Sequence, residues 1–135
     1  MEWELWLYTC SYFTWSEQKR YHKAWERRYD QLRALAKNGG VIQICIYGGY
    51  LNKNEKEASV DDVVRHIDHA VKVAGIDHVG IGSDFDGGGG VLGCKGDNDM
   101  INITVKLIEK GYSEEDLRKI WGGNFFRVMN QVINK

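Results

Sequence analysis

The feature that most constrains the fold is a short apolar run that ends in acids and glycines. Residues 77–87 read DHVGIGSDFDG, and three more glycines follow directly. The run has no helical period, so it predicts a buried strand whose C-terminal end carries Asp84 and Asp86. Parallel α/β proteins gather their reactive side chains at this end of their strands. In a strand the two carboxylates would point to one side, a turn at the glycines would separate them, and both arrangements stay open.

The residues that precede this run complete a βαβ pattern. The apolar run at 41–47, VIQICIY, predicts a strand that is buried on both faces. A helix is predicted over 59–74, where Ser59 and Asp62 have the spacing of a capping box and apolar residues recur at helical period. The next strand is expected over 78–83. This order predicts an α/β fold with two parallel strands joined by a crossover helix.

The chain on either side of the βαβ unit is predicted to be helical. A charged helix is expected over 16–37, and Gly39 and Gly40 follow its end. Past the glycine tract, helices are expected over 100–110, over 113–121 and from 124 onward. Their apolar stripes are expected to face the core. These stripes are Ile101, Val105 and Ile108 in the first helix and Phe125, Val128, Met129 and Val132 in the last.

Residues 1–29 differ in composition from the rest of the chain. Four of the five tryptophans lie there, and residues 2–15 are dense in aromatic side chains that partly alternate, which predicts a strand. The same residues include Glu2 and Glu4 and lack a basic start, so we expect neither a signal peptide nor a membrane span. The chain therefore divides into an N-terminal segment, 1–29, and a folded unit, 30–135.

Composition narrows the class of function. A net charge of −1 provides no basic field for nucleic acid, which leaves small polar substrates or protein partners. The cysteines, Cys10, Cys45 and Cys94, form no C-x-x-C pair, so we expect no disulfide framework, no cysteine-based zinc site and a cytoplasmic location. A chain of 135 residues suffices for one domain. It is short for a (β/α)₈ barrel, which needs roughly 250 residues.

The glycine tract fails the tests for known phosphate and calcium loops. A dinucleotide fingerprint needs glycine where Phe85 stands, and no P-loop lysine follows. As a calcium loop it has Gly88 at the third ligand position and Lys95 at the closing glutamate. We expect the tract to form a mobile rim of the site instead.

The histidines do not form a recognisable metal site. His66 and His69 lie three residues apart on the predicted helix, and a zinc site needs further ligands. We interpret both as structural. His78 is expected at the opposite end of its strand from Asp84, and His22 belongs to the charged helix.

The polar residues that follow the first strand are expected to line the same mouth as Asp84. These are Tyr47, Tyr50 and Asn52.

Three blocks of the sequence resemble, in order, the C-terminal third of the membrane (renal-type) dipeptidases, a family of zinc metallopeptidases. They are VDDVVRHIDH at 60–69, GIGSDFDG at 80–87 and GYSEEDLRKIWGGNFF at 111–126. The resemblance implies a (β/α)₈ TIM barrel that hydrolyses dipeptides at a binuclear Zn²⁺ site. It implies that this chain supplies the last two βα units and the C-terminal helices, which are incomplete as a barrel.

The resemblance also implies roles for individual residues. Asp84 occupies the position of the acid that lies beside the zinc ions, contacts the substrate and takes part in proton transfer. From the residues alone, a catalytic carboxylate and a turn cap are both open for Asp84. Tyr47 is expected to contribute to the substrate wall. Asp86 is expected to hold the loop by accepting bonds from backbone N–H groups.

The zinc ligands that the family would supply do not map onto this sequence. They come from a His-x-Asp step, a bridging glutamate and two later histidines, and residues 14–28, TWSEQKRYHKAWERR, stand where the last of these is expected. Neither Arg27 nor Arg28 matches the family's carboxylate-binding arginine. We therefore expect a chain that binds no zinc, is inactive alone, and forms homo-oligomers through exposed strand edges. The alternatives are a non-catalytic interaction fragment and, third, a small anion-binding α/β module.

Overall fold

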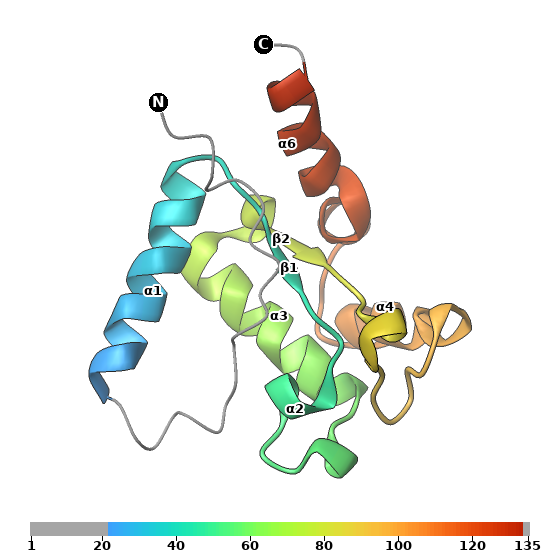
Figure 1. Ribbon diagram of the computed structural model, residues 1–135. Helices are drawn as coiled ribbons and strands as arrows, with labels where there is room; N and C mark the ends of the chain where they lie inside the picture. Colours follow the sequence, from blue (N-terminus) through green and yellow to red (C-terminus); the bar gives the residue numbers. More distant parts are fainter. Residues whose placement is uncertain (1–21, 134–135) are drawn as a thin grey trace.

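Two short parallel strands, with one long helix between them in the chain, organise the fold (Figure 1). The computed structural model describes residues 22–133, with side chains from Tyr29 onward. Strand β1 spans Ile42–Ile44 and pairs in parallel with β2, Val79–Ile81. The connecting helix α3 spans Val60–Ala74 and contacts both strands. The predicted βαβ unit is confirmed.

The remaining helices follow the predicted order, with shifted ends. The α-helices are α1 (His22–Lys37), α2 (Gly48–Leu51), α4 (Ile101–Glu109), α5 (Glu114–Arg118) and α6 (Asn124–Ile133), and a π-helical turn, η6, spans Lys119–Gly123. Short 3-10 turns lie at Glu55–Glu57, Ile76–His78, Phe85–Gly87 and Asp97–Asp99. The strand expected over residues 2–15 lies outside the described residues. Within residues 22–133, no helix combines the length and the apolar character needed to cross a membrane.

The sheet is buried on one face. Ile42 and Ile44 of β1 are each 6% exposed and belong to the same buried cluster as the apolar side chains of α3. Gln43 and Cys45, which alternate with them, are partly exposed. The expectation of a strand buried on both faces is therefore wrong for this structure, because α3 covers the isoleucine face.

The glycines of β2 make room for Gln43. A methyl group at Gly80 would lie 2.4 Å from Oε1 of Gln43, so the glutamine side chain lies directly against the strand. At Gly82 the same group would approach the Ile44 carbonyl oxygen to 3.2 Å. The Gly-x-Gly step thus permits close packing of the paired strands.

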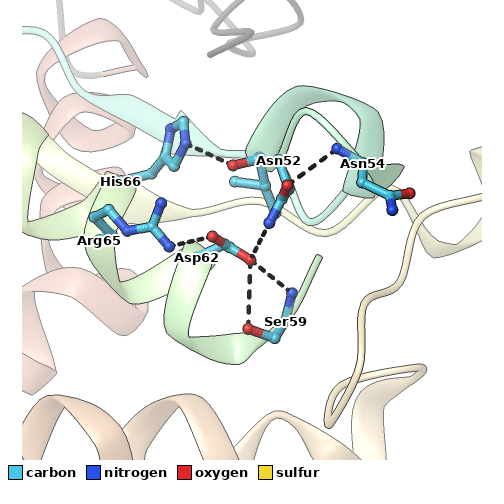
Figure 2. A network of polar contacts seen from close by, with 7 residues as sticks. Asn52, Asn54, Ser59, Asp62, Arg65 and His66 are labelled. Atoms are coloured by element: carbon cyan, nitrogen blue, oxygen red, sulfur yellow. Dashed lines mark hydrogen bonds and ion pairs between the residues drawn. The ribbon is translucent and has the colours of Figure 1, made fainter. Parts of the chain in front are cut away.

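A polar network fixes the start of α3 and confirms the predicted capping box (Figure 2). Asp62 is 2% exposed, and its Oδ2 accepts from the Ser59 N–H at 3.0 Å and from Asn52 Nδ2 at 3.1 Å. Arg65 donates to the other oxygen. Burial alone would raise the pKa of Asp62, but the bonds from Asn52 and Ser59 and the charge of Arg65 hold it below its usual range. Asn52, expected at the mouth of the site, is instead part of this network.

The expected core face of α4 is wrong. Ile103 and Leu107 are fully buried, whereas the exposed fractions of Ile101, Val105 and Ile108 are 61%, 46% and 56%. The helix carries apolar residues on two faces, and the one bearing Ile103 and Leu107 joins the buried core with α3.

The last helix shows the same kind of difference. Val128 is buried at 4% exposure, as expected, whereas Phe125 is partly exposed and its ring contacts that of Phe126 edge-on. Met129 and Val132 are 36% and 48% exposed.

Two side chains of helix α6 bind backbone carbonyls at the start of both strands. The Asn124 side chain, 3% exposed, donates through Nδ2 to the Ile76 carbonyl at 2.7 Å and to the Val79 carbonyl at 2.8 Å. Arg127 donates to the Gly39 carbonyl before β1 and to the Asp77 carbonyl before β2, each at 2.8 Å. Turn η6 also packs along β2. We call these bonds from Asn124 and Arg127 the clamp. No sequence pattern predicted it.

Candidate functional site

The carboxyl ends of β1 and β2 bring Tyr47 and Asp84 to one edge of the sheet. Beyond the strands, the Ile46 N–H donates to the Ser83 carbonyl at 2.9 Å, and Tyr47 forms a parallel bridge with Gly90. The two chain segments therefore stay paired past the point where each strand ends. The edge so formed is the place where a parallel sheet presents its side chains to a ligand.

Asp84 adopts an unusual backbone conformation at this edge. Its φ is 81° and its ψ is 22°, and it is the one non-glycine residue with positive φ among the described residues. Left-handed geometry is costly for residues with a Cβ, although aspartate tolerates it better than most, and such conformations cluster at functional sites. The side chain is exposed, and the Cys45 thiol donates to its Oδ2 at 3.5 Å. The structure thus holds a carboxylate facing solvent at the mouth.

The glycine tract is tied down by its own backbone. The N–H groups of Gly87 and Gly89 donate to the Asp84 carbonyl, and that of Gly90 donates to the Ile46 carbonyl at 2.6 Å. The Gly88 N–H is likewise used, by the Phe85 carbonyl. These four amide groups already have acceptors and therefore form no phosphate-binding loop. The hypothesis of an anion-binding module depended on such a loop, so it loses its support. Backbone bonds thus tie the tract to Asp84 and Ile46, and the mobility expected of it stays a prediction.

Asp86 does not play the role expected of it. Its side chain is exposed and makes no hydrogen bond within the part of the chain that the structure describes. The main-chain carbonyl of Asp84 accepts the bonds that hold the loop. The turn after Asp84 also separates the two acids, since residues 85–87 form a 3-10 turn.

Tyr47 directly precedes helix α2. Its ring contacts that of Tyr50 edge-on, with the centroids 4.8 Å apart. The Glu55 carboxylate raises the pKa of the Tyr47 phenol, and the charge of Asp84 adds to the effect. Tyr47 therefore stays a neutral hydrogen-bonding group near neutral pH, as a residue in a substrate wall requires.

An open hollow of about 320 Å³ lies next to this pair. One wall comes from the segment after α2 and the other from the glycine tract and the residues after it. The lining residues are Glu55, Lys56, Ala58, Gly89, Gly90, Val91, Leu92 and Lys95. No sequence pattern identified this hollow, because its two walls are far apart in the chain.

The histidines are structural, as expected, where their side chains are described. His66 is 9% exposed, its Nε2 lies 3.3 Å from the Leu51 carbonyl, and burial lowers its pKa. His69 packs its ring against Tyr29 at 5.3 Å between centroids. His78 Nδ1 lies 2.8 Å from the Gly40 carbonyl, at the opposite end of the strands from Asp84. The side chain of His22 lies outside the described part.

A binuclear zinc site does not fit the residues that the structure describes. Two zinc ions need several histidine, carboxylate or cysteine ligands around a shared centre. Between Tyr29 and Ile133 no three such side chains come together in a way that would hold a metal ion. Asp84 has Cys45 beside it, and these two groups are fewer than one zinc ion requires. Cys94 is buried and adds no exposed ligand at this edge.

Comparison with other proteins shows which family the chain resembles. A sequence model of the membrane dipeptidases, peptidase family M19, matches residues 27–135. Dipeptidase tcpJ of Claviceps purpurea is 36% identical over 102 residues, which are 75% of this chain and 24% of that protein. An uncharacterized dipeptidase of Schizosaccharomyces pombe is 37% identical over 108 residues, 78% of this chain and 26% of the relative.

Solved structures agree with the sequence comparison. The probable dipeptidase PvdM from Pseudomonas aeruginosa has a TM-score of 0.71 and 29% identity, and the match covers 74% of this chain and 39% of that one. A metallopeptidase from Rhodobacter sphaeroides, solved with a phosphinate mimic of the dipeptide L-Ala-D-Ala, also has a TM-score of 0.71, at 27% identity. That match covers 76% of this chain and 30% of the other.

The proteins that the chain resembles are dipeptidases, and two of the solved structures are described as metallopeptidases. The chain belongs to the membrane dipeptidase family, peptidase family M19, as the three sequence blocks predicted. It spans about a quarter of the length of the curated relatives that it matches.

Proposed function

We propose that this chain carries the substrate-facing acid of a metal-dependent dipeptidase, built on the last two βα units of a (β/α)₈ barrel. The observation that carries the proposal is the placement of Asp84. It lies at the carboxyl end of β2, exposed and in a left-handed conformation, in a chain that belongs to a dipeptidase family. In barrels of this type the chemistry is done by residues that end the strands.

Each residue at the mouth has a chemical task in this proposal. The Asp84 carboxylate is the complement of the ammonium group of a dipeptide, so it binds the amino end of the substrate. It can also take a proton from the attacking water and pass it to the peptide nitrogen that leaves when the C–N bond breaks. Tyr47 supplies an aromatic wall and a neutral hydroxyl. The bonds from Gly87 and Gly89 to the Asp84 carbonyl fix the backbone of Asp84, which limits the positions that its carboxylate can take.

The metal ions that the family implies would supply the activated water, and no step here is routed through them. Because the described residues do not fit a zinc pair, we further propose that the chain by itself hydrolyses no dipeptide. It would then be the substrate-binding part of a site whose metal ligands lie elsewhere.

The proposal is tested by dipeptide binding to the isotope-labelled chain in NMR titrations. Glycylglycine is expected to shift the amide signals of residues 82–90 at millimolar concentration. Asp84→Asn should weaken this binding by about threefold to tenfold, since a charged partner is lost. The matched control is Asp86→Asn, which removes an exposed carboxylate from the same loop. Equal effects of the two substitutions would show that Asp84 has no special role.

A second candidate is a non-catalytic interaction fragment. Two observations favour it. The described residues hold no zinc pair, and apolar side chains are exposed along α4 and α6. On this account the chain forms homo-oligomers, through these faces or the strand edges. Sedimentation at the monomer mass across micromolar to millimolar concentration would eliminate it.

A further inference from the structure

The function proposed above assigns no role to the hollow beside Tyr47. It is bounded by two backbone bridges between the loops that follow the strands, Tyr47 with Gly90 and Ser59 with Leu92. The Leu92 N–H donates to the Ala58 carbonyl at 2.8 Å, which closes the far end. Because both ends are tied by backbone pairs, the hollow exists before any ligand binds.

The floor of the hollow is apolar and its rim is charged. Ala58 and Val91 are 1% and 5% exposed, so they give it a packed apolar base. Lys56 and Lys95 line the rim, and neither ammonium group forms an ion pair with any other residue in the described part of the chain. Glu55, also on the rim, lies beside the Tyr47 phenol. The two lysines therefore leave the rim with an excess of positive charge.

The hollow adjoins the proposed substrate acid. Gly89 lines it, and the Gly89 N–H donates to the Asp84 carbonyl at 2.7 Å. Tyr47 pairs with Gly90, which also lines the hollow, so Tyr47 borders it. We expect a substrate whose ammonium group lies at Asp84 to extend along the glycine tract toward the lysines.

We propose that this hollow is a specificity subsite for an acidic side chain of the substrate, with Lys56 and Lys95 as the cations that bind its carboxylate. The inference rests on the function proposed for Asp84. The volume of the hollow favours a whole side chain over a carboxylate alone. About 320 Å³ lies within the usual range of ligand pockets and exceeds what a bare carboxylate fills. The apolar floor contacts the methylene groups, and the rim binds the charge.

The test compares three peptides that differ in the place of their carboxylate. Gly-Glu-amide has one in the side chain, Gly-Gln-amide has none, and glycylglycine has only the terminal one. NMR titration of the full chain is expected to show that Gly-Glu-amide binds about fivefold tighter than the other two, as two exposed ion pairs would give. The double variant Lys56→Gln, Lys95→Gln should abolish this preference. The control Lys37→Gln, Lys72→Gln removes two exposed lysines from α1 and α3 and should retain it.

The outcomes separate this inference from the function on which it rests. If all three peptides bind equally and Asp84→Asn weakens them all, the subsite is refuted and the role of Asp84 stands. If glycylglycine binds best, the hollow takes no side chain. A preference for Gly-Glu-amide that survives in the Lys56, Lys95 double variant would also refute the assignment. If Gly-Glu-amide shifts the signals of the hollow and Asp84→Asn has no effect, the subsite stands and the role of Asp84 falls.

Discussion

Replacing Asn124 tests how helix α6 supports the sheet. Its Nδ2 group donates to the carbonyls of Ile76 and Val79 at 2.7 and 2.8 Å, and the side chain is 3% exposed. Asn124→Ala leaves both acceptors without this donor. A buried polar group that loses its partner costs about 1–3 kcal/mol, so we expect a loss of about 3 kcal/mol for the two together.

Urea denaturation followed by circular dichroism measures this loss. For a slope of about 1.5 kcal/mol per molar urea, the midpoint should fall by about 2 M. Asn130→Ala, an exposed substitution in the same helix, is the control and should change stability by less than about 0.5 kcal/mol. Asn124→Asp separates the bonds from the packing, because a carboxylate of the same size cannot donate. If Asn124→Ala and Asn130→Ala lose equal stability, the clamp is not what holds β2.

Two further predictions concern the histidines and the glycine tract. Burial lowers the pKa of His66, so the unfolded state binds more protons, and stability should fall as the pH drops below about 6.5. His66→Gln should reduce this slope in urea titrations between pH 5 and 8, and an unchanged slope would contradict the assignment. A methyl group at Gly89 would lie 2.4 Å from the Asp84 carbonyl oxygen, so Gly89→Ala should cost about 1–3 kcal/mol. Gly96→Ala, with open space around it, should be nearly neutral, and equal melting temperatures for the two variants would refute the argument.

Local patterns predicted the elements and their order well. The capping box at Ser59 is predicted from spacing alone, since Asp62, three residues on, accepts from the Ser59 N–H. The placement of His78 away from the mouth follows from its position before β2. In each case a few consecutive residues decide the outcome.

Tertiary contacts decided the features that the sequence did not reveal. Helix α4 has apolar residues on two faces, and only its packing with α3 selects Ile103 and Leu107 over Ile101 and Val105. Asn52 follows β1 closely enough to line the mouth, yet the buried Asp62 carboxylate binds it instead. The hollow depends on a pairing between loops that are distant in the chain, for which no local pattern exists.

The most direct test of the account is the zinc content of the purified chain. We propose that Asp84 faces a substrate and that the residues around it do not supply the metal ligands. After incubation with excess zinc and exhaustive dialysis, mass spectrometry of the metal is predicted to find no stoichiometric zinc, and no hydrolysis of a dipeptide should follow. Two zinc ions retained per chain, with Asp84→Asn abolishing dipeptide hydrolysis, would contradict it and show a self-sufficient enzyme.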